Sequence, residues 1–293
     1  MILIEQAKSI KGAIRCPYHS WCYSTDGHLI STPHVGGPGR NLHGSIDRSN
    51  LGLTEIRSHV WMGVIWINLS DTAPNFEDSM KDLIDRWADF DRPLFHGGSE
   101  SSFTIEVAAN WKLAVENYCE SYHLPWVHPG LNTYSRLEDH YHIEHKNIFS
   151  GQGTKVYKQL EDKEGNSFPD FPNLNDKWDT AAEYIAVYPN VLLGVHRDHT
   201  FAIILIPDGP EKTYEHVHLF YSCKNTSKQL RRENMKLWKN VFEEDVPVVQ
   251  GMQKGRHAVK FDGGRFSPVM DSPTHCFHYW VASEIQNGRK QKD

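Results

Sequence analysis

Apolar residues change their spacing several times along the chain, and each spacing predicts a different element. The continuous apolar run at 60–69 predicts a buried strand, and the periodicity of the apolar positions at 76–90 predicts an amphipathic helix. Three further segments, at 184–195, 199–207 and 212–223, are separated by Asp, Gly and Pro turn signals and predict strands. Together these strands favour an antiparallel sheet.

Two long helical segments are predicted beside this sheet. A strand at 101–109 leads into the first helix, and Thr226 or Ser227 can cap the second, which runs to about Gly251. Strands and helices together indicate an α+β chain. The polar segment at 158–177 contains prolines and several acidic residues, so we expect an entrance loop or lid there rather than a linker.

The first of these helical segments presents polar residues at helical spacing. Glu116, Glu120 and His123 stand at i, i+4 and i+7, so on a helix they share one face. Pro125 lacks an N–H group and is expected to loosen the helix between His123 and His128. That loosening lets His128 swing back toward His123, so that two neutral imidazoles bind one metal ion.

An iron ion that activates dioxygen commonly takes a carboxylate as a third protein ligand. The predicted candidate is Asp245, which lies in an acidic cluster of the second helix and precedes an apolar run that we expect to anchor it in the core. Glu243 and Glu244 are alternatives on spacing alone. Two imidazoles and a carboxylate also suit zinc, and a His-x4-His pair taken alone is more often a packed, hydrogen-bonded feature than a metal site.

A second motif lies near the beginning of the chain. Cys16 and His19 form a Cys-x2-His pair, followed by the turn dipeptide at 26–27 between short β-prone segments. A Rieske [2Fe-2S] cluster uses two thiolates and two imidazoles, so it needs a Cys-x-His pair as well. The chain has no Cys or His before Cys16.

Together these motifs resemble the large (alpha) subunit of the Rieske non-haem iron oxygenases of the aromatic-ring-hydroxylating type. The matching pattern is Cys-x2-His, Asn-Trp-Lys at 110–112, an acidic residue three positions before the first histidine, His-x4-His and a late Asp. Ring hydroxylases usually carry Asp at the acidic position, and Glu there resembles the branch that oxidises quaternary ammonium compounds such as choline, carnitine or glycine betaine. The resemblance implies Cys16 and His19 as cluster ligands, His123, His128 and Asp245 as iron ligands, Glu120 as the acidic bridge between the two centres, and Asn117 as a further catalytic residue.

The resemblance also implies an architecture. We expect a partial Rieske β domain at 1–45 and a catalytic domain at 46–293 with the helix-grip (START-like) fold, a curved antiparallel sheet around long helices. Because the family's Cys-x-His pair precedes a segment similar to the first residues of this chain, Met1 resembles an internal methionine. An N-terminally truncated chain of this kind is expected to be inactive alone and unable to hold a complete cluster. Residues 1 to about 45 are then expected to be partly exposed or poorly stable.

The implied activity is that of an oxygenase with a mononuclear Fe(II). Electrons from NAD(P)H arrive through a ferredoxin or a flavin/iron-sulfur reductase, pass the Rieske [2Fe-2S] cluster, and cross to the iron of a neighbouring subunit in a homotrimer. Dioxygen and a small quaternary ammonium compound are the implied substrates, and the compound is hydroxylated or N-demethylated. Aromatic faces attract methylated ammonium groups, and the candidates for a cage are Trp126, Trp178, Tyr184 and Trp280.

Composition agrees with an enzyme of this kind and excludes other classes. A chain of 293 residues with 39% hydrophobic content can bury a substantial core. A net charge of −6 without any basic run argues against nucleic acid as a partner. The apolar runs are too short to span a bilayer, no signal peptide is recognisable, and five scattered cysteines form no disulfide framework. These features predict a cytoplasmic protein without a membrane partner.

Three alternatives remain open from the sequence. The first is an aromatic-ring dioxygenase, which uses the same ligand set. The second is a zinc hydrolase at His123, His128 and Asp245, which leaves Cys16 and His19 unexplained. The third is a ligand-binding helix-grip module without redox activity, because the fold by itself does not decide function.

Overall fold

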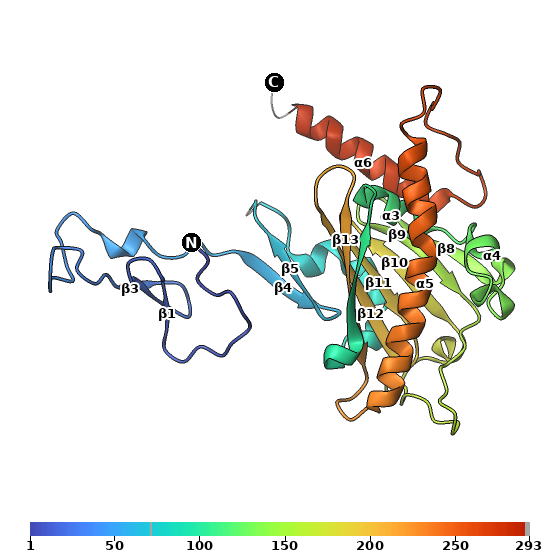
Figure 1. Cartoon of the computed structure of the whole chain (residues 1–293), viewed down its shortest axis with the longest axis horizontal. Coiled ribbons are helices and arrows are strands. Elements are labelled where there is room, and N and C mark those ends of the chain that lie inside the picture. Colours follow the sequence, from blue (N-terminus) through green and yellow to red (C-terminus); the bar gives the residue numbers. More distant parts are fainter. Residues whose placement is uncertain (71, 291–293) are drawn as a thin grey trace. The chain divides into compact units, whose positions relative to one another are not determined.

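The computed structural model describes residues 1–70 and 72–290 of the chain (Figure 1). These residues belong to two compact units, which we call the N-terminal unit (Met1–His59 with Trp66–Ala73) and the C-terminal unit (Val60–Ile65 with Pro74–Asp293). The predicted domain boundary near residue 45 stays a prediction. None of the described helices is both long and apolar enough to cross a membrane.

The N-terminal unit contains one small antiparallel sheet. Its three strands, in the order β1-β2-β3, span Ala13–Arg15, Cys22–Ser24 and Leu29–Ser31. The turn between β2 and β3 includes Gly27, whose φ of 92° is accessible to glycine without strain. Leu29 and Thr32 are the buried side chains among residues 1–59, so this unit has little core of its own.

The apolar run at 60–69 is not the single buried strand that its composition predicts. It is divided between two strands, β4 (Arg57–Trp61) and β5 (Val64–Asn68), joined by a turn in which Met62 and Gly63 both have positive φ. Consecutive side chains along a strand point to opposite faces, and here Trp61 is buried whereas Val60 is 70% exposed. A Cβ at Gly63 would lie within 2.8 Å of the Phe220 ring, so only glycine fits this turn.

An antiparallel sheet of eight strands forms the framework of the described C-terminal unit. Seven strands follow the order β6-β13-β12-β11-β10-β9-β8, and β7 also pairs with β13. This is the mixed helix-and-sheet fold with an antiparallel sheet that the sequence predicts. The strands span Phe95–His96 (β6), Ser102–Val107 (β7), His140–His145 (β8), Phe149–Thr154 (β9), Ala182–Val187 (β10), Val191–Val195 (β11), His199–Pro207 (β12) and Thr213–Tyr221 (β13).

Most predicted strands have counterparts in this sheet. The strand predicted at 199–207 has those bounds as β12, and the strand predicted at 184–195 is a hairpin of β10 and β11. The sequence analysis did not predict β8 or β9. Two glycines interrupt the apolar pattern of β9, and at Gly153 a Cβ would lie within 2.7 Å of the Tyr141 ring on β8. Close packing of neighbouring strands therefore explains why the pattern is weak there.

Helices cover the sheet and connect its strands. The helix predicted at 76–90 is interrupted at Met80 and forms two short helices and a 3₁₀ turn. The longest helix, α5, begins after Ser227, whose hydroxyl accepts the Leu230 N–H at 3.4 Å, so Ser227 is the cap. The α-helices span Phe76–Ser79 (α1), Lys81–Arg86 (α2), Trp111–Cys119 (α3), Leu124–Val127 (α4), Lys228–Gly255 (α5) and Ser272–Lys290 (α6); 3₁₀ helices span Arg48–Asn50, Ala88–Phe90, Gly98–Ser101, Leu131–Thr133, Leu137–Asp139 and Asp176–Asp179.

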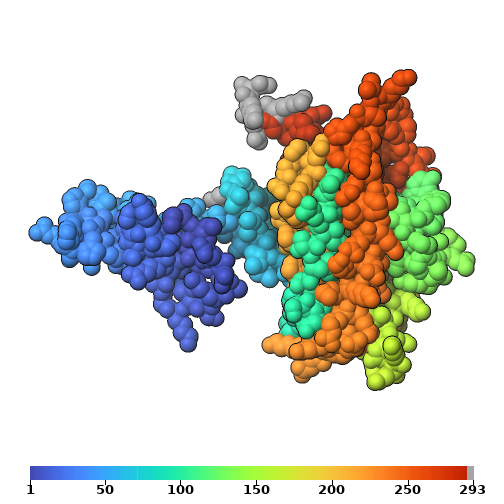
Figure 2. Space-filling view, in the orientation of Figure 1, coloured from blue at the N-terminus to red at the C-terminus, as the bar shows by residue number. Residues whose placement is uncertain are grey.

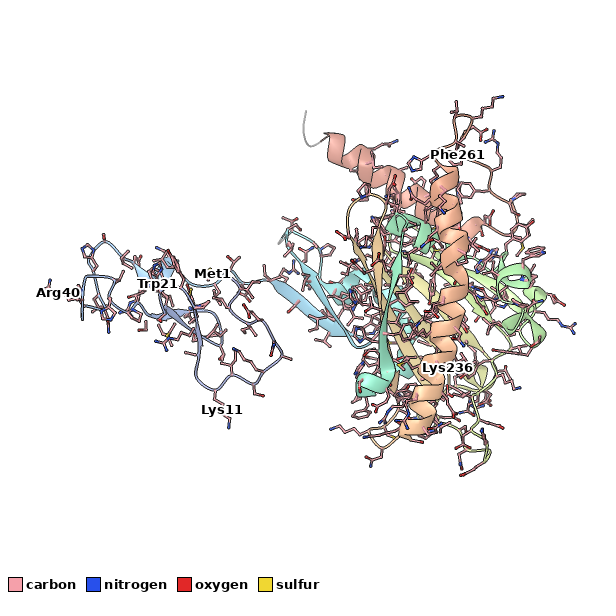
Figure 3. All side chains as sticks on the ribbon, viewed as in Figure 1. Met1, Lys11, Trp21, Arg40, Lys236 and Phe261 are labelled. Atoms are coloured by element: carbon pink, nitrogen blue, oxygen red, sulfur yellow. The ribbon has the colours of Figure 1, made fainter. Side chains whose placement is uncertain are left out.

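The core of the C-terminal unit lies between the sheet and the helices α3, α5 and α6. Val115, Leu205 and Leu219 are completely buried in it. Figure 2 shows α5 and β7 side by side on the surface of this unit, and the two elements are in contact. The opposite face of α5 is polar, and the side chain of Lys236 extends from it (Figure 3). The helix therefore presents one apolar face to the sheet, which fixes the direction of its acidic residues.

Candidate metal centre

The chain leaves the helical conformation between α3 and the first histidine. The helix α3 ends at Cys119, and Glu120 has an extended backbone with φ −126° and ψ 160°. The Glu120 carboxylate accepts the backbone N–H of His123 at 3.2 Å and so begins a new turn. The prediction that Glu116, Glu120 and His123 share one helical face is therefore wrong. Glu116 instead pairs with Arg256 at 3.0 Å.

The turn between the two histidines is helical, contrary to the prediction that Pro125 loosens it. Pro125 lies in the first turn of α4, where an N–H group has no acceptor within the helix, so proline is tolerated. The His128 N–H donates to the Leu124 carbonyl at 2.9 Å. His123 and His128 thus flank a single helical turn, and their ring centroids are 5.2 Å apart.

The side chains of His123, His128 and Asp245 converge on one point. A ligand atom of each lies within 4.8 Å of those of the other two. Asp245 Oδ1 is 3.0 Å from His128 Nε2 and 3.6 Å from His123 Nε2. Among the described residues this is the one group of three or more His, Cys, Asp or Glu side chains that could hold a metal ion.

Each histidine is held through its other ring nitrogen by a glutamate. His123 Nδ1 lies 2.6 Å from Glu120 Oε1, and His128 Nδ1 lies 2.8 Å from Glu244 Oε2. A carboxylate only accepts, so both Nδ1 atoms carry a proton, and a neutral ring then keeps its lone pair on Nε2. A carboxylate on the outer nitrogen is the usual way to orient a metal-binding imidazole.

These donors fit a divalent metal ion. In the tautomer set by Glu244, the His128 Nε2 lone pair faces Asp245 Oδ1, a buried oxygen without a hydrogen-bonding partner of good geometry. Two facing lone pairs repel unless a cation lies between them. Burial alone would lower the pKa of His128, but the carboxylates of Asp245 and Glu244 outweigh burial and raise it, so the site favours positive charge. Two imidazoles and one carboxylate are the set that leaves positions open on a non-haem iron.

The orientation of α5 distinguishes among the three neighbouring acidic residues that were candidates for the third ligand. Glu243 pairs with Lys239 along the helix, Glu244 contacts His128 Nδ1, and Asp245 faces both Nε2 atoms. The apolar run after Asp245 is a weaker anchor than expected, because only Val249 in it is fully buried.

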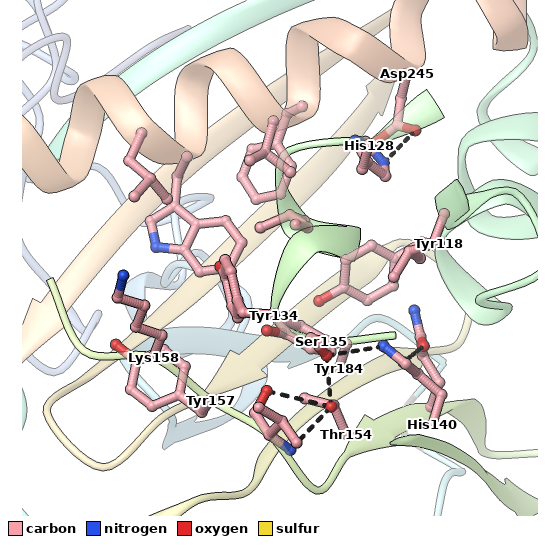
Figure 4. A pocket seen from close by; sticks show the side chains of 18 of the residues that line it. Tyr118, His128, Tyr134, Ser135, His140, Thr154, Tyr157, Lys158, Tyr184 and Asp245 are labelled. Carbon is pink, nitrogen blue, oxygen red and sulfur yellow. Dashed lines mark hydrogen bonds and ion pairs between the residues drawn. The ribbon is translucent and has the colours of Figure 1, made fainter. Parts of the chain in front are cut away.

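A pocket extends from the three convergent side chains (Figure 4). His128 and Asp245 lie at one end of it in this view, and Tyr157 and Lys158 lie at the other. Asn117, the further predicted residue of the site, is 8% exposed and lines this pocket. The structure therefore places Asn117 in the wall of the pocket that the three convergent side chains also line.

Aromatic side chains form much of the pocket wall. Of the four predicted cage residues, Tyr184 lines the pocket. Trp126 is instead 72% exposed, Trp178 is buried against Phe90, and Trp280 stacks on Phe277, so these three candidates do not line the pocket. Rings that the sequence analysis missed, from segments far apart in the chain, are Tyr118, Tyr134, Tyr157, Trp238 and Phe242.

A chain of polar side chains on the same wall was also missed. His140 pairs with Gln152 Oε1 at 2.6 Å and with Ser135 Oγ at 3.1 Å, and Ser135 contacts Thr154 at 2.7 Å. Burial lowers the pKa of His140, which keeps its imidazole neutral. Gln152 in turn donates to the Glu120 carbonyl at 3.3 Å, so this wall is connected to the segment that holds His123. Alternating polar residues on β8 and β9 gave no recognisable motif.

The segment predicted to be an entrance loop does border the pocket. Lys158 and Leu160 line it. The side chains of Phe168 and Phe171 are each 2% exposed, so the later part of the segment is anchored in the core.

The N-terminal unit carries the predicted cluster pair on one loop. The Cys16 N–H donates to the Trp21 carbonyl at 2.8 Å and closes the loop, and His19 on it is exposed. A Rieske cluster takes two thiolates and two imidazoles. The described residues bring together no set of four such donors, so Cys16 and His19 by themselves do not fit a whole cluster.

Comparisons with known proteins match both parts of the chain. Residues 97–287 match the family described as ring hydroxylating alpha subunit (catalytic domain), and residues 1–43 match the Rieske [2Fe-2S] domain. The carnitine monooxygenase oxygenase subunit of Acinetobacter pittii (strain PHEA-2) is 24% identical over 86% of this chain, and chloroplastic choline monooxygenase of Arabidopsis thaliana is 25% identical over 94%.

Solved structures share the fold. A crystal structure of the quaternary ammonium Rieske monooxygenase CntA superimposes with a TM-score of 0.74 at 22% identity, covering 97% of this chain and 74% of that one. Naphthalene 1,2-dioxygenase with indole bound superimposes with a TM-score of 0.70 at 14% identity, covering 95% of this chain and 74% of that one.

The match to the catalytic-domain family covers more than half of the chain and includes all three convergent side chains. The chain spans 65% of the length of the carnitine monooxygenase subunit and 64% of the choline monooxygenase. The chain belongs to the family of ring-hydroxylating alpha subunits, through their catalytic domain.

Proposed function

We propose that this chain is the oxygenase component of a Rieske-type non-haem iron oxygenase, with Fe(II) held by His123, His128 and Asp245. The observation that carries the proposal is the convergence of two Nε2 atoms and one carboxylate oxygen at the end of a pocket. When bound, Fe(II) supplies the reductive activation of dioxygen, which no side chain can perform.

The residues around the metal ligands have supporting roles in this proposal. Glu120 and Glu244 hold the two imidazoles in the tautomer that binds metal. Glu120 is also the proposed bridge for electrons, since its carboxylate contacts a metal ligand and is still partly exposed. The apolar rings of the pocket limit the access of water, and Asn117 presents a polar amide beside the reacting position.

The proposed substrate is a small quaternary ammonium compound. Relatives named as carnitine and choline monooxygenases support this class. The acidic bridge is Glu, as in that branch of the family, and an aromatic pocket suits methylated ammonium groups. Hydroxylation or N-demethylation of such a compound is the proposed reaction, and an aromatic ring is the alternative substrate.

The electron supply and the assembly are proposed from family membership. Electrons come from NAD(P)H through a ferredoxin or flavin/iron-sulfur reductase, and a homotrimer brings a Rieske cluster to each mononuclear site. Cys16 and His19 are the proposed ligands that this chain gives to the cluster, which needs two further donors.

The first experiment measures the metal. The chain is purified without oxygen, supplied with Fe(II), and analysed for iron, zinc and acid-labile sulfide. We expect about one iron per chain with little sulfide, and an EPR signal of half-integer spin when nitric oxide binds the iron. Zinc without iron would favour a hydrolase, and no bound metal would favour a ligand-binding module.

Two variants show whether the metal occupies the proposed site. Asp245→Asn should lose at least about tenfold in Fe(II) affinity, because an amide replaces the charged ligand. Glu243→Gln is the matched control, because its partner is Lys239 on the outer face of α5. Equal iron content in both variants would contradict the ligand assignment. Oxygen consumption with a reductase, NAD(P)H and choline, carnitine or glycine betaine then tests the substrate class.

A further inference from the structure

Asp198, in the turn between β11 and β12, is a buried carboxylate behind the pocket wall. Its side chain is completely inaccessible to solvent. Oδ1 accepts the Tyr157 hydroxyl at 2.9 Å and lies 2.8 Å from His199 Nδ1. Oδ2 has no hydrogen bond of good geometry among the described residues, and the Gln159 amide is a further polar neighbour of this carboxylate. A carboxylate removed from water in this way is normally paired with a cation.

The protonation of His199 shows that it is not that cation. The Trp238 Nε1–H donates to His199 Nε2 at 2.8 Å, so Nε2 must carry a lone pair. The single ring proton is therefore on Nδ1 and is donated to Asp198. The imidazole is neutral, and the negative charge remains on Asp198.

The nearest cation in sequence, Arg197, is engaged elsewhere. Its guanidinium binds Asp170 at 2.5 Å and lies 3.6 Å from Asp179. Two carboxylates already balance this one guanidinium, so its attraction to Asp198 offsets the buried charge only in part. Among the described residues, no lysine or arginine forms an ion pair with Asp198.

The charge of Asp198 lies directly behind the aromatic part of the pocket. Tyr157 and His199, its two hydrogen-bonding partners, both line the pocket, together with Trp238 and Tyr184. His196 stacks on His199 with ring centroids 4.3 Å apart and pairs with the Tyr184 hydroxyl at 3.1 Å, which fixes the rings of this wall. Aromatic faces and a poorly screened negative charge both attract a cation.

We infer that Asp198 is a specificity-determining residue that selects a cationic substrate, by placing a buried negative charge without a lysine or arginine ion pair behind the Tyr157, His199 and Trp238 wall. The inference rests on the proposed function, because it assigns the charge of the substrate of the same pocket. Asp198 does not touch the substrate and acts through the rings. Lys158 on the same wall is exposed, so water screens its opposite charge.

Two probes of equal shape and different charge test this inference. Choline carries a trimethylammonium group, and 3,3-dimethylbutan-1-ol carries an uncharged tert-butyl group in its place. Isothermal titration calorimetry on the purified chain should show that choline binds at least about tenfold more tightly. Failure of choline to bind at millimolar concentration, or equal binding of the two probes, would overturn the inference.

Asp198→Asn removes the charge with little change of shape. The Asn carbonyl can still accept from His199 and Tyr157, and its NH₂ group takes the place of Oδ2, which has no hydrogen bond of good geometry to lose. The preference for choline over the alcohol should fall by about tenfold. An unchanged preference in this variant refutes the inference.

The matched control is Asp208→Asn, which makes the same change of net charge at a side chain that is 61% exposed, pairs with Lys212 and does not line the pocket. It should leave the preference unchanged. Trp238→Phe is the second variant: it keeps a ring but removes the N–H, so His199 can take a second proton and neutralise Asp198. It should therefore also reduce the preference, and a full preference in this variant counts against the inference. Circular dichroism confirms that each variant is folded.

Binding of these probes needs neither iron, oxygen nor a reductase, so the inference and the proposed function fail separately. A preference for choline that disappears in Asp198→Asn, in a chain that binds no iron, would support cation selection and reject the oxygenase. Iron binding and oxygen consumption without a preference for choline would support the oxygenase and reject cation selection by Asp198.

Discussion

Replacement of Glu183 by glutamine should strongly destabilise the C-terminal unit. Glu183 on β10 is completely buried and accepts five hydrogen bonds. Oε2 accepts Arg86 Nε and Trp87 Nε1, each at 2.8 Å. Oε1 accepts Arg86 Nη2 at 2.8 Å, Tyr141 at 2.7 Å and Lys177 at 2.6 Å. This carboxylate therefore connects α2 and β8 to β10, which also carries the pocket residue Tyr184.

The expected loss follows from counting the donors that lose an acceptor. Glutamine keeps the volume, but its NH₂ group cannot accept a hydrogen bond. If this group replaces Oε2, two donors, Trp87 Nε1–H and Arg86 Nε–H, lose their acceptor, and this is the smaller of the two possible losses. Trp87 is 1% exposed, and leaving a buried donor unsatisfied costs about 1–3 kcal/mol. The ion pairs with Arg86 and Lys177 are also weakened, by an amount reduced because these side chains are 33% and 40% exposed. Together these losses lower the free energy of unfolding by about 3–4 kcal/mol, near the usual cost of breaking a buried ion pair.

Urea denaturation at neutral pH, followed by circular dichroism, measures this change in the free energy of unfolding. The midpoint of thermal unfolding should fall by roughly 10 °C. Glu164→Gln, at an exposed position, is the control and should change stability by less than about 0.5 kcal/mol. A loss below about 1 kcal/mol for Glu183→Gln would mean that water or a side-chain rearrangement replaces the missing acceptor, and would refute the reasoning.

The difference in the free energy of unfolding between wild type and Glu183→Gln should also depend on pH, which provides a second check. Burial alone would raise the pKa of Glu183, but the hydrogen bonds from Arg86 and Lys177 outweigh it and lower the pKa. A carboxyl whose pKa is lower in the folded chain stabilises the fold above its unfolded pKa, about 4.3, and loses this contribution as the pH falls through the folded value. The difference between wild type and Glu183→Gln should therefore shrink progressively below about pH 4.3.

Three further predictions concern the pocket and its surroundings. Glu120→Gln should keep its iron yet lower turnover at least about tenfold, because the amide cannot hold His123 as a carboxylate does; normal iron with unchanged turnover would reject the electron bridge. Gly151→Ala should destabilise the chain by about 2 kcal/mol in urea, because its Cβ would lie 2.8 Å from Ile185 Cα on the neighbouring strand; Gly130→Ala, with open space around its Cα, is the control. Lys158→Gln should weaken the binding of carnitine relative to choline by about two- to fivefold in calorimetry, because only carnitine has a carboxylate for Lys158 to attract.

Local sequence patterns predicted the elements that carry strong signals. The turn signals on either side of the segment at 199–207 gave β12, and the hydroxyl at Ser227 gave the beginning of α5. The His-x4-His pair was identified because a metal site needs those residue types at close spacing. These features depend on neighbouring residues, which a single sequence displays directly.

Features that depend on packing between distant segments could not be predicted in this way. Glu243, Glu244 and Asp245 are consecutive on a helix and point about 100° apart, so only the rotation of α5 against the sheet decides which of them reaches the histidines. Trp238 belongs to the pocket because of that same rotation. Asp198 lies in no recognisable motif, because its significance depends on Arg197 pairing with Asp170 and Asp179 instead of with it.

The three proposed metal ligands come from elements of very different length, and this difference has a consequence for the stability of the chain. His123 and His128 flank the four-residue helix α4, whereas Asp245 belongs to the 28-residue helix α5. An ion bound to all three ties the short segment to the long helix, and it stabilises the tied state by about 2.7 kcal/mol when present at a hundred times its dissociation constant. Without the ion, the segment around α4 should be the first part of the C-terminal unit to open and be cut by proteases. Iron supply would then set the lifetime of the protein in the cell as well as its activity.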